Sequence, residues 1–324
     1  MTEYVYVSPV TSPFYNRLVK PFCVWLCDHV VPECVPAWSI TLFGLGLVLS
    51  SVCLITTGNH VLAGILWSTY GVLDNVDGCQ ARKTGTSSRA GEFLDHAVDS
   101  LVASLSAFAW LSSIVDVTTV EGQDFRAGWL FPTMWIVGQL PFFVACWAHH
   151  ILGRLLIGSS FTKCDWFTVD EFNILFVPGL IMSRGIIPSL WALELGAGCK
   201  FSDLWLLLTY IVTIWNLAIV MWQLEKAPTF LPPALALQTC HVLLGTTFIV
   251  RAVTFAMLAI EVIVQRFNVH SRGVLRYLWW PLVCAIPLSQ LPDTIGTGAV
   301  ILTAWLVYVW NYYRYLSDKS TAKK

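Results

Sequence analysis

Long apolar runs constrain this chain more than any other feature of its sequence. Several runs reach about 20 residues, the length at which a helix crosses a bilayer core roughly 30 Å thick. Of the 324 residues, 56% are hydrophobic and only 12% are charged, whereas soluble domains carry roughly 25% charged residues. The mean hydropathy is +0.67. These features predict an all-α, polytopic helical membrane protein and exclude an ordinary soluble domain.

The positions of the apolar runs predict about ten transmembrane helices. Their expected ranges are 38–57, 61–82, 92–115, 127–147, 170–191, 204–223, 234–249, 252–265, 278–291 and 295–314. The stretch 234–265 could form either one long tilted helix or two short ones. Lys and Arg residues fall on alternate connections, whereas the connection at 116–126 is acidic. The positive-inside rule therefore favours ten spans with both chain ends in the cytoplasm.

The segment before the first span differs from a cleaved signal peptide. Residues 1–17 are polar and mixed, without the basic start and short apolar core of such a signal. Over 14–35, charged residues are interspersed with Phe22 and Trp25, which is typical of an amphipathic helix in the membrane interface. We therefore expect a cytoplasmic segment and interfacial helix over 1–35. The net charge is −1 without a basic block, so no nucleic acid partner is expected.

Acidic residues inside two consecutive spans form the most informative pattern. Residues at i, i+3, i+4, i+7 and i+8 share one face of a helix. In the second span these positions hold Asp74, Asp77, Gly78, Ala81 and Arg82. In the third span the positions i, i+4 and i+8 hold Gly91, Asp95 and Asp99. An Asp-Gly pair alone is usually a turn, but the joint pattern predicts two neighbouring helices that direct four carboxylates at each other.

Four carboxylates inside a membrane require compensation. Each costs about 2.5–3.5 kcal/mol on insertion, so four cost on the order of 10 kcal/mol before their mutual repulsion. Arg82 alone cannot neutralise them, whereas divalent cations can, and ligands made only of oxygen select hard ions such as Mg²⁺. Two ions would suit an in-line phosphoryl displacement. We therefore expect two Mg²⁺ ions, with Mn²⁺ as a substitute, just below the cytoplasmic headgroups.

The whole pattern resembles the signature of the CDP-alcohol phosphotransferases, D-x2-D-G-x2-A-R-x8-G-x3-D-x3-D. Every fixed position is matched, and residues 78–84 and 91–96 resemble the eukaryotic choline/ethanolamine phosphotransferase branch. The resemblance is strong over 14–100, patchy over 140–175 and only hydropathic beyond. This chain departs from the branch at Ala37 and Trp38, where a Pro-Asn pair is usual.

The resemblance implies a role for each residue of the signature. The implied metal ligands are Asp74, Asp77, Asp95 and Asp99. Glycine and alanine leave room for a nucleotide to approach closely, and a guanidinium suits phosphate oxygens. The implied substrate-binding residues are Gly78, Ala81, Arg82 and Gly91.

The acceptor hydroxyl also needs a base. His96 is the first choice because imidazole titrates near neutral pH, and Asp99 is the general-family alternative. In the branch an acidic residue after the fourth span supports this histidine, and Glu171 holds the comparable place here. Capping of a helix N-terminus is the competing explanation for Glu171. His149 and His150 are expected to be interfacial rather than catalytic.

The resemblance implies transfer of phosphoethanolamine or phosphocholine from CDP-ethanolamine or CDP-choline to diacylglycerol, with release of CMP. It also implies a homodimer in the endoplasmic reticulum membrane, with the site facing the cytoplasm. Residues 36–223 would be the catalytic transmembrane core, 224–316 the C-terminal transmembrane helices and 317–324 a cytoplasmic tail. The alternatives are a CDP-diacylglycerol-dependent phosphatidyltransferase with an acceptor such as inositol, and a metal-ion transporter whose acids line an ion path.

Overall fold

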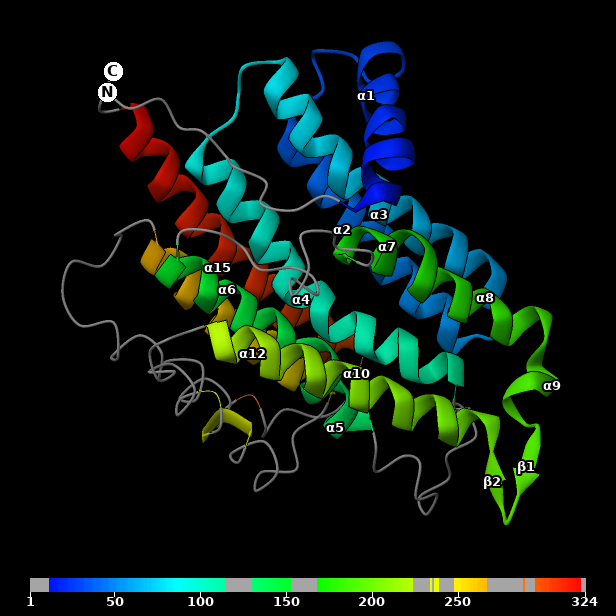
Figure 1. The fold of residues 1–324 in the computed structure, drawn as a ribbon. Coiled ribbons are helices and arrows are strands. Elements are labelled where there is room, and N and C mark those ends of the chain that lie inside the picture. The colour runs from blue at the N-terminus through cyan, green and yellow to red at the C-terminus, as the bar shows by residue number, and fades with distance from the viewer. Residues whose placement is uncertain are drawn as a thin grey trace.

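A computed structural model (Figure 1) describes residues 12–114, 130–152, 168–223, 234, 236–238, 248–266, 288 and 295–321, and these residues are almost entirely helical. The longer helices are α1 (Lys20–His29), α2 (Ala37–Thr56), α3 (His60–Lys83), α4 (Arg89–Ile114), α6 (Leu140–Leu152), α8 (Val177–Ile186), α10 (Phe201–Gln223), α12 (Phe248–Arg266) and α15 (Ile295–Thr321). The shorter helices are α5 (Leu130–Thr133), α7 (Val169–Glu171) and α9 (Pro188–Trp191), and π-helical turns lie at Tyr15–Val19, Met134–Gln139 and Phe172–Phe176. The expected helical fold is confirmed.

Helix α4 runs through the middle of the bundle (Figure 1). It packs against α2 and α8, and also against α12 and α15 from the C-terminal part of the chain. Buried side chains occur along nearly its whole length, from Ala90 to Ile114. Aromatic contacts such as Phe108 with Phe248, whose ring centroids are 5.1 Å apart, join it to α12. The helix that carries Asp95 and Asp99 is therefore surrounded by protein.

Three of the described helices are long and apolar enough to cross a membrane. They are α2, α4 and the part of α10 from Phe201 to Ala218. The first three expected spans coincide closely with α2, α3 and α4. Nearly all of the expected span 278–291 and most of 234–249 lie outside the described residues, so the count of ten stays a prediction. Helix α12 begins at Phe248, and residues 239–247 lie outside the described residues, so the choice between one long helix and two short ones over 234–265 stays open.

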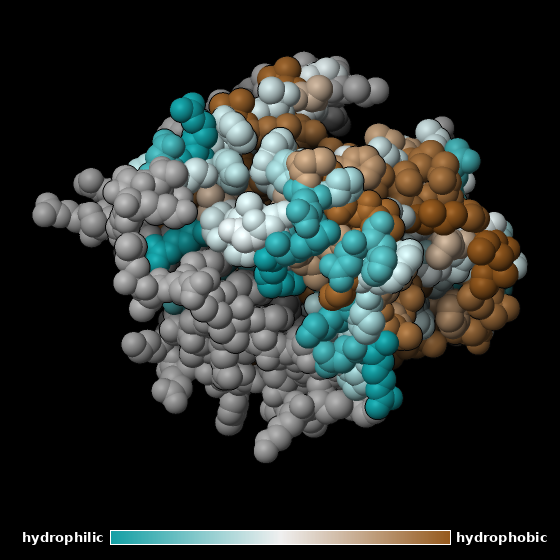
Figure 2. All heavy atoms as spheres, turned by 90° about the horizontal axis from the view of Figure 1, so that it is seen from above, coloured by the Kyte–Doolittle hydropathy of each residue, from teal (hydrophilic) through white to brown (hydrophobic). Residues whose placement is uncertain are grey.

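Hydrophobic side chains cover one side of the described surface. Figure 2 shows hydrophobic residues gathered along the right of the molecule as seen from above, whereas hydrophilic residues lie mainly toward the centre of that view. The large exposed apolar residues include Phe43 of α2, Leu62 and Ile65 of α3, and Ile211 and Trp215 of α10. Exposed apolar side chains on several helices are what a lipid bilayer would cover.

The N-terminal helix packs on the signature helix through one face. The Cys27 Sγ donates to the Val76 carbonyl of α3 at 3.4 Å, and the Lys83 Nζ of α3 donates to the Cys27 carbonyl at 2.6 Å. The opposite face exposes Phe22 and Trp25. A helix therefore lies where the amphipathic helix is expected, and its amphipathic and interfacial character stays a prediction.

A small hairpin departs from the expected all-α fold. Strands β1 (Glu194–Gly196) and β2 (Cys199–Lys200) pair antiparallel just before α10. Gly196, Ala197 and Gly198 connect them with positive φ angles of 106°, 52° and 75°. Two of these three residues are glycines, which adopt such angles without a steric penalty.

Candidate active site

A tight turn joins the two signature helices. Helix α3 ends in a Schellman motif, in which Gly85 has φ +65° and the Thr86 N–H donates to the Ala81 carbonyl at 2.9 Å. Helix α4 begins directly afterwards, and the Ser88 Oγ accepts the Gly91 N–H at 3.1 Å. Helices α2 and α8 each pack against both α3 and α4. The local sequence therefore places the two acidic faces at neighbouring positions in one bundle.

Three of the four signature acids meet between α3 and α4. Asp74, Asp95 and Asp99 each offer a carboxylate oxygen, and these oxygens lie within 4.8 Å of one another. All three side chains are half-buried. Like charges at such distances destabilise one another unless a cation or protons intervene, and carboxylate oxygens are the ligands that Mg²⁺ prefers. This cluster could hold a divalent metal ion.

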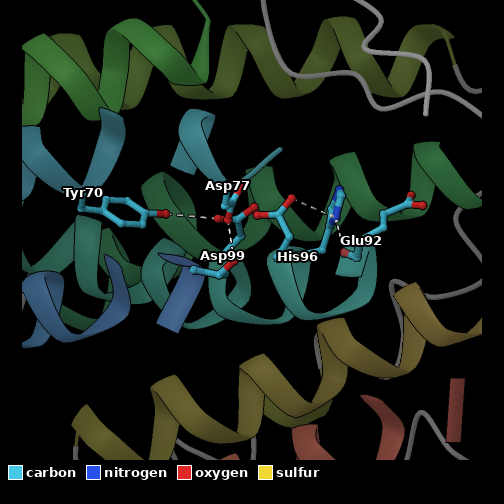
Figure 3. Close-up of polar contacts among 7 residues, drawn as sticks. Tyr70, Asp77, Glu92, His96 and Asp99 are labelled. Carbon is cyan, nitrogen blue, oxygen red and sulfur yellow. Dashed lines mark hydrogen bonds and ion pairs between the residues drawn. The ribbon is translucent and has the colours of Figure 1, made fainter. Parts of the chain in front are cut away.

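The fourth acid, Asp77, borders this cluster. It is 5% exposed, and its Oδ2 accepts a hydrogen bond from the Thr41 Oγ1 of α2 at 2.5 Å. Its oxygens are outside the group of three that lies within 4.8 Å. Figure 3 shows the side chains of Asp77 and Asp99 directed toward the same space. The expected convergence is therefore close for three acids, with the fourth beside them.

Tyr70 supports Asp99 and was missed by the sequence analysis. Its hydroxyl donates to the Asp99 Oδ1 at 3.1 Å (Figure 3), and its ring is buried in the bundle. Partners of this kind fix the orientation of metal-binding carboxylates. Helical spacing could have found Tyr70, because it lies four residues before Asp74. Thr41 belongs to another helix, and no spacing rule indicates its contact with Asp77.

The Arg82 side chain runs back along α3 and covers Gly78. A Cβ atom built at Gly78 would be 3.3 Å from the Arg82 Nη1, and the Arg82 Nη2 donates to the Cys79 Sγ at 3.4 Å. Gly78 thus leaves space for the guanidinium. Arg82 itself is exposed, so its charge remains accessible to a ligand.

The two other small residues of the signature are less crowded. Ala81 is half-buried and Gly91 is exposed. A Cβ atom at Gly91 would lie 3.4 Å from the Ser88 Oγ, which is an ordinary contact. Among the described residues only the Ser88 Oγ lies within 4 Å of such a Cβ atom, and a nucleotide-binding role for both residues stays a prediction.

The hydrogen bond of His96 assigns its tautomer. The His96 Nδ1 lies 2.8 Å from the Glu92 carbonyl oxygen (Figure 3). A carbonyl oxygen can only accept, so Nδ1 carries the proton and a neutral ring keeps a lone pair on Nε2. The Asp95 Oδ2 is 3.9 Å from the same Nδ1. The hydrogen bond thus holds the Nδ1 edge of the His96 ring, and the basic Nε2 lies at the opposite edge.

Glu171 is engaged at the start of α7. Its carboxylate accepts from the Thr168 N–H at 2.7 Å and from the Ser12 hydroxyl, and Thr168 and Glu171 form a capping box. The neighbouring Asp170 accepts from the Asn75 side chain of α3 at 2.8 Å. The capping alternative is therefore confirmed, whereas support of the signature histidine by Glu171 stays a prediction.

The same region of the chain defines its family. Residues 35–222 match the family model described as CDP-alcohol phosphatidyltransferase. The chain belongs to this family. The matched region contains all four signature acids and extends from the start of α2 almost to the end of α10.

This chain is similar to curated proteins over part of their length. Choline/ethanolaminephosphotransferase 2 of Arabidopsis thaliana is 33% identical over 159 residues, which cover 46% of this chain and 36% of the relative. Cholinephosphotransferase 1 of Xenopus laevis is 30% identical over 200 residues, which cover 58% of this chain and 44% of the relative. The matched part of the chain thus spans less than half the length of these relatives.

Proposed function

We propose that this member of the CDP-alcohol phosphatidyltransferase family transfers phosphoethanolamine or phosphocholine from CDP-ethanolamine or CDP-choline to diacylglycerol. The products would be phosphatidylethanolamine or phosphatidylcholine, and CMP. The observation that carries the proposal is the meeting of Asp74, Asp95 and Asp99 oxygens within 4.8 Å. The choice of alcohol is supported by the names of the similar proteins.

The donor set fits divalent cations. All the candidate ligands are carboxylates, and three of them converge from two helices. We propose two Mg²⁺ ions, replaceable by Mn²⁺, held by Asp74, Asp77, Asp95 and Asp99. When bound, these ions would supply electrophilic stabilisation of the charge on the donor pyrophosphate.

Arg82 and the small residues of the signature would position the donor. The exposed guanidinium of Arg82 suits phosphate oxygens. Gly78, Ala81 and Gly91 would let the nucleotide approach the helix backbones. Gly91 supports this role in particular, because a Cβ atom there would meet only an ordinary contact with the described residues.

His96 would act as the base. Its Nε2 would take the proton of the diacylglycerol hydroxyl while that oxygen forms a bond to the phosphorus next to the alcohol. The bond from this phosphorus to the bridging oxygen would break, and CMP would leave with the electron pair. The hydrogen bond from Nδ1 to the Glu92 carbonyl supports this assignment, because it keeps the lone pair on Nε2. Asp99 is the alternative base, and Glu171 would support His96.

We also propose where the enzyme lies in the cell and how it assembles. The enzyme would cross the endoplasmic reticulum membrane about ten times, with its active site facing the cytoplasm, and would form a homodimer. The apolar faces of α2 and α10 support lipid contact. The acids near the polar end of α3 would let a soluble nucleotide and a membrane lipid reach one site.

The test is CMP release by purified protein with diacylglycerol and Mg²⁺, using each CDP-alcohol separately. Asp95→Asn should abolish CMP release, whereas Asp28→Asn, at an exposed acid of α1, should not. Activity with CDP-diacylglycerol and inositol instead would favour the phosphatidyltransferase alternative. Metal flux into vesicles without CMP release would favour the transporter. Full activity of Asp95→Asn would remove Asp95 from the mechanism.

A further inference from the structure

A second histidine lies beside His96 inside the bundle. His149 belongs to α6, and its ring centroid is 5.8 Å from that of His96 with an interplanar angle of 38°. His96 is 4% exposed and His149 is 7% exposed. The sequence analysis expected His149 at the membrane interface, but the structure buries it against the proposed base. No rule of helical spacing joins these residues, because they lie on different helices.

The contact restrains a ring that is otherwise held at one edge. The hydrogen bond from the His96 Nδ1 to the Glu92 carbonyl fixes one point of the imidazole. The terminal torsion of a histidine has a broad energy minimum, so the hydrogen bond does not by itself determine the tilt of the ring, and packing must do so. A second ring packed beside it limits this tilt. Ring contacts at such centroid distances stabilise the packed geometry beyond what burial alone contributes.

We propose that His149 is a positioning residue that holds the imidazole of His96 in the orientation from which Nε2 meets the acceptor hydroxyl. This inference rests on the proposed function, in which His96 is the base. His149 acts through the face and edge of its ring, so another aromatic ring can replace it. It neither binds the donor nor takes part in proton transfer.

The chain provides a matched control in the next residue. His150 is the same residue type on the same helix, about 100° further around its axis, and it is half-buried. A substitution there imposes the same loss of an imidazole on α6. It leaves the contact between His96 and His149 in place.

The experiment compares His149→Ala, His149→Phe and His150→Ala in the CMP-release assay. We expect His149→Ala to lower kcat roughly three- to tenfold, which corresponds to the loss of one ring contact. The KM for the CDP-alcohol and the Mg²⁺ dependence should not change. His149→Phe should stay within about twofold of the parent protein, since it keeps the ring. His150→Ala should match the parent. His149→Leu, which keeps much of the volume, takes the place of the alanine variant if that variant does not fold.

A second measurement does not depend on catalysis. Diethyl pyrocarbonate modifies accessible imidazoles, and peptide mass spectrometry can follow its reaction at His96. A released ring should react faster in His149→Ala than in the parent, and at the parental rate in His149→Phe and His150→Ala. If His96 is modified at equal rates in His149→Ala and in the parent, the contact does not restrain the ring and the proposal is overturned.

The kinetic outcomes separate this inference from the proposed function. No CMP release by the parent with any CDP-alcohol would mean that the proposed function has failed. CMP release by the parent with an unchanged kcat in His149→Ala would overturn the role of His149 alone. An equal loss in His149→Phe and His149→Ala would also overturn it, because a polar property of the imidazole would then be required.

Discussion

Replacing Tyr70 by Phe tests whether the polar surroundings of the acids control metal binding. The substitution removes the hydroxyl that donates to the Asp99 Oδ1 at 3.1 Å, and it leaves the buried ring in place. A hydrogen bond to a charged group contributes about 1.5–3 kcal/mol, and each 1.4 kcal/mol corresponds to a factor of ten. We therefore expect the Mg²⁺ concentration for half-maximal activity to rise roughly 10- to 100-fold.

The assay is CMP release over a Mg²⁺ titration at a fixed concentration of CDP-alcohol. Tyr210→Phe is the matched control, because its hydroxyl is hydrogen-bonded to the Thr133 Oγ1 at 2.9 Å outside the acidic cluster. This variant should keep the parental Mg²⁺ dependence. An unchanged titration curve for Tyr70→Phe would refute the reasoning, since Asp99 would then hold its position without the hydroxyl.

Three further predictions address the acids and the packing. Thr41→Val removes the hydrogen bond to Asp77 without changing the size of the side chain, so kcat should fall roughly tenfold; parental kinetics would contradict this. Exhaustive chelation should abolish CMP release and added Mg²⁺ should restore it, whereas activity that survives chelation would contradict a metal mechanism. Gly138→Ala should sharply lower the thermal stability in detergent, because its Cβ would lie 2.1 Å from the Ala103 carbonyl oxygen. Gly179→Ala, with nothing within 4 Å of the new Cβ, is its control, and equal stability of both would contradict the packing.

The convergence of the acids was predictable because helical periodicity fixes which residues share a face. Asp95 and Asp99 are four residues apart on α4, so their meeting needs only the helix itself. The meeting with Asp74 also depends on a tight turn, and the sequence contains its glycine at position 85. The capping box was likewise predictable, since Thr168 and Glu171 have the required spacing.

Contacts between distant helices were not predictable in the same way. Thr41 reaches Asp77 from α2, and His149 reaches His96 from α6. These contacts depend on how the helices pack, which local spacing does not determine. The hairpin over 194–200 was missed for another reason. Its strands are only three and two residues long, and the Gly196–Gly198 turn lies between two apolar runs, where hydropathy does not indicate a hairpin.

The packing of C-terminal helices around α4 determines which part of the chain is needed to keep the acids covered. The family match ends at residue 222, yet α4 is covered by α12 and α15 through contacts such as Phe108 with Phe248 and Phe93 with Tyr312. A shortened protein ending at the limit of the match would uncover an apolar side of the helix that carries two acids. Lipid would then occupy that side, next to charged groups that hydrocarbon solvates poorly. Helices α12 and α15 therefore separate the helix that carries Asp95 and Asp99 from the surrounding acyl chains.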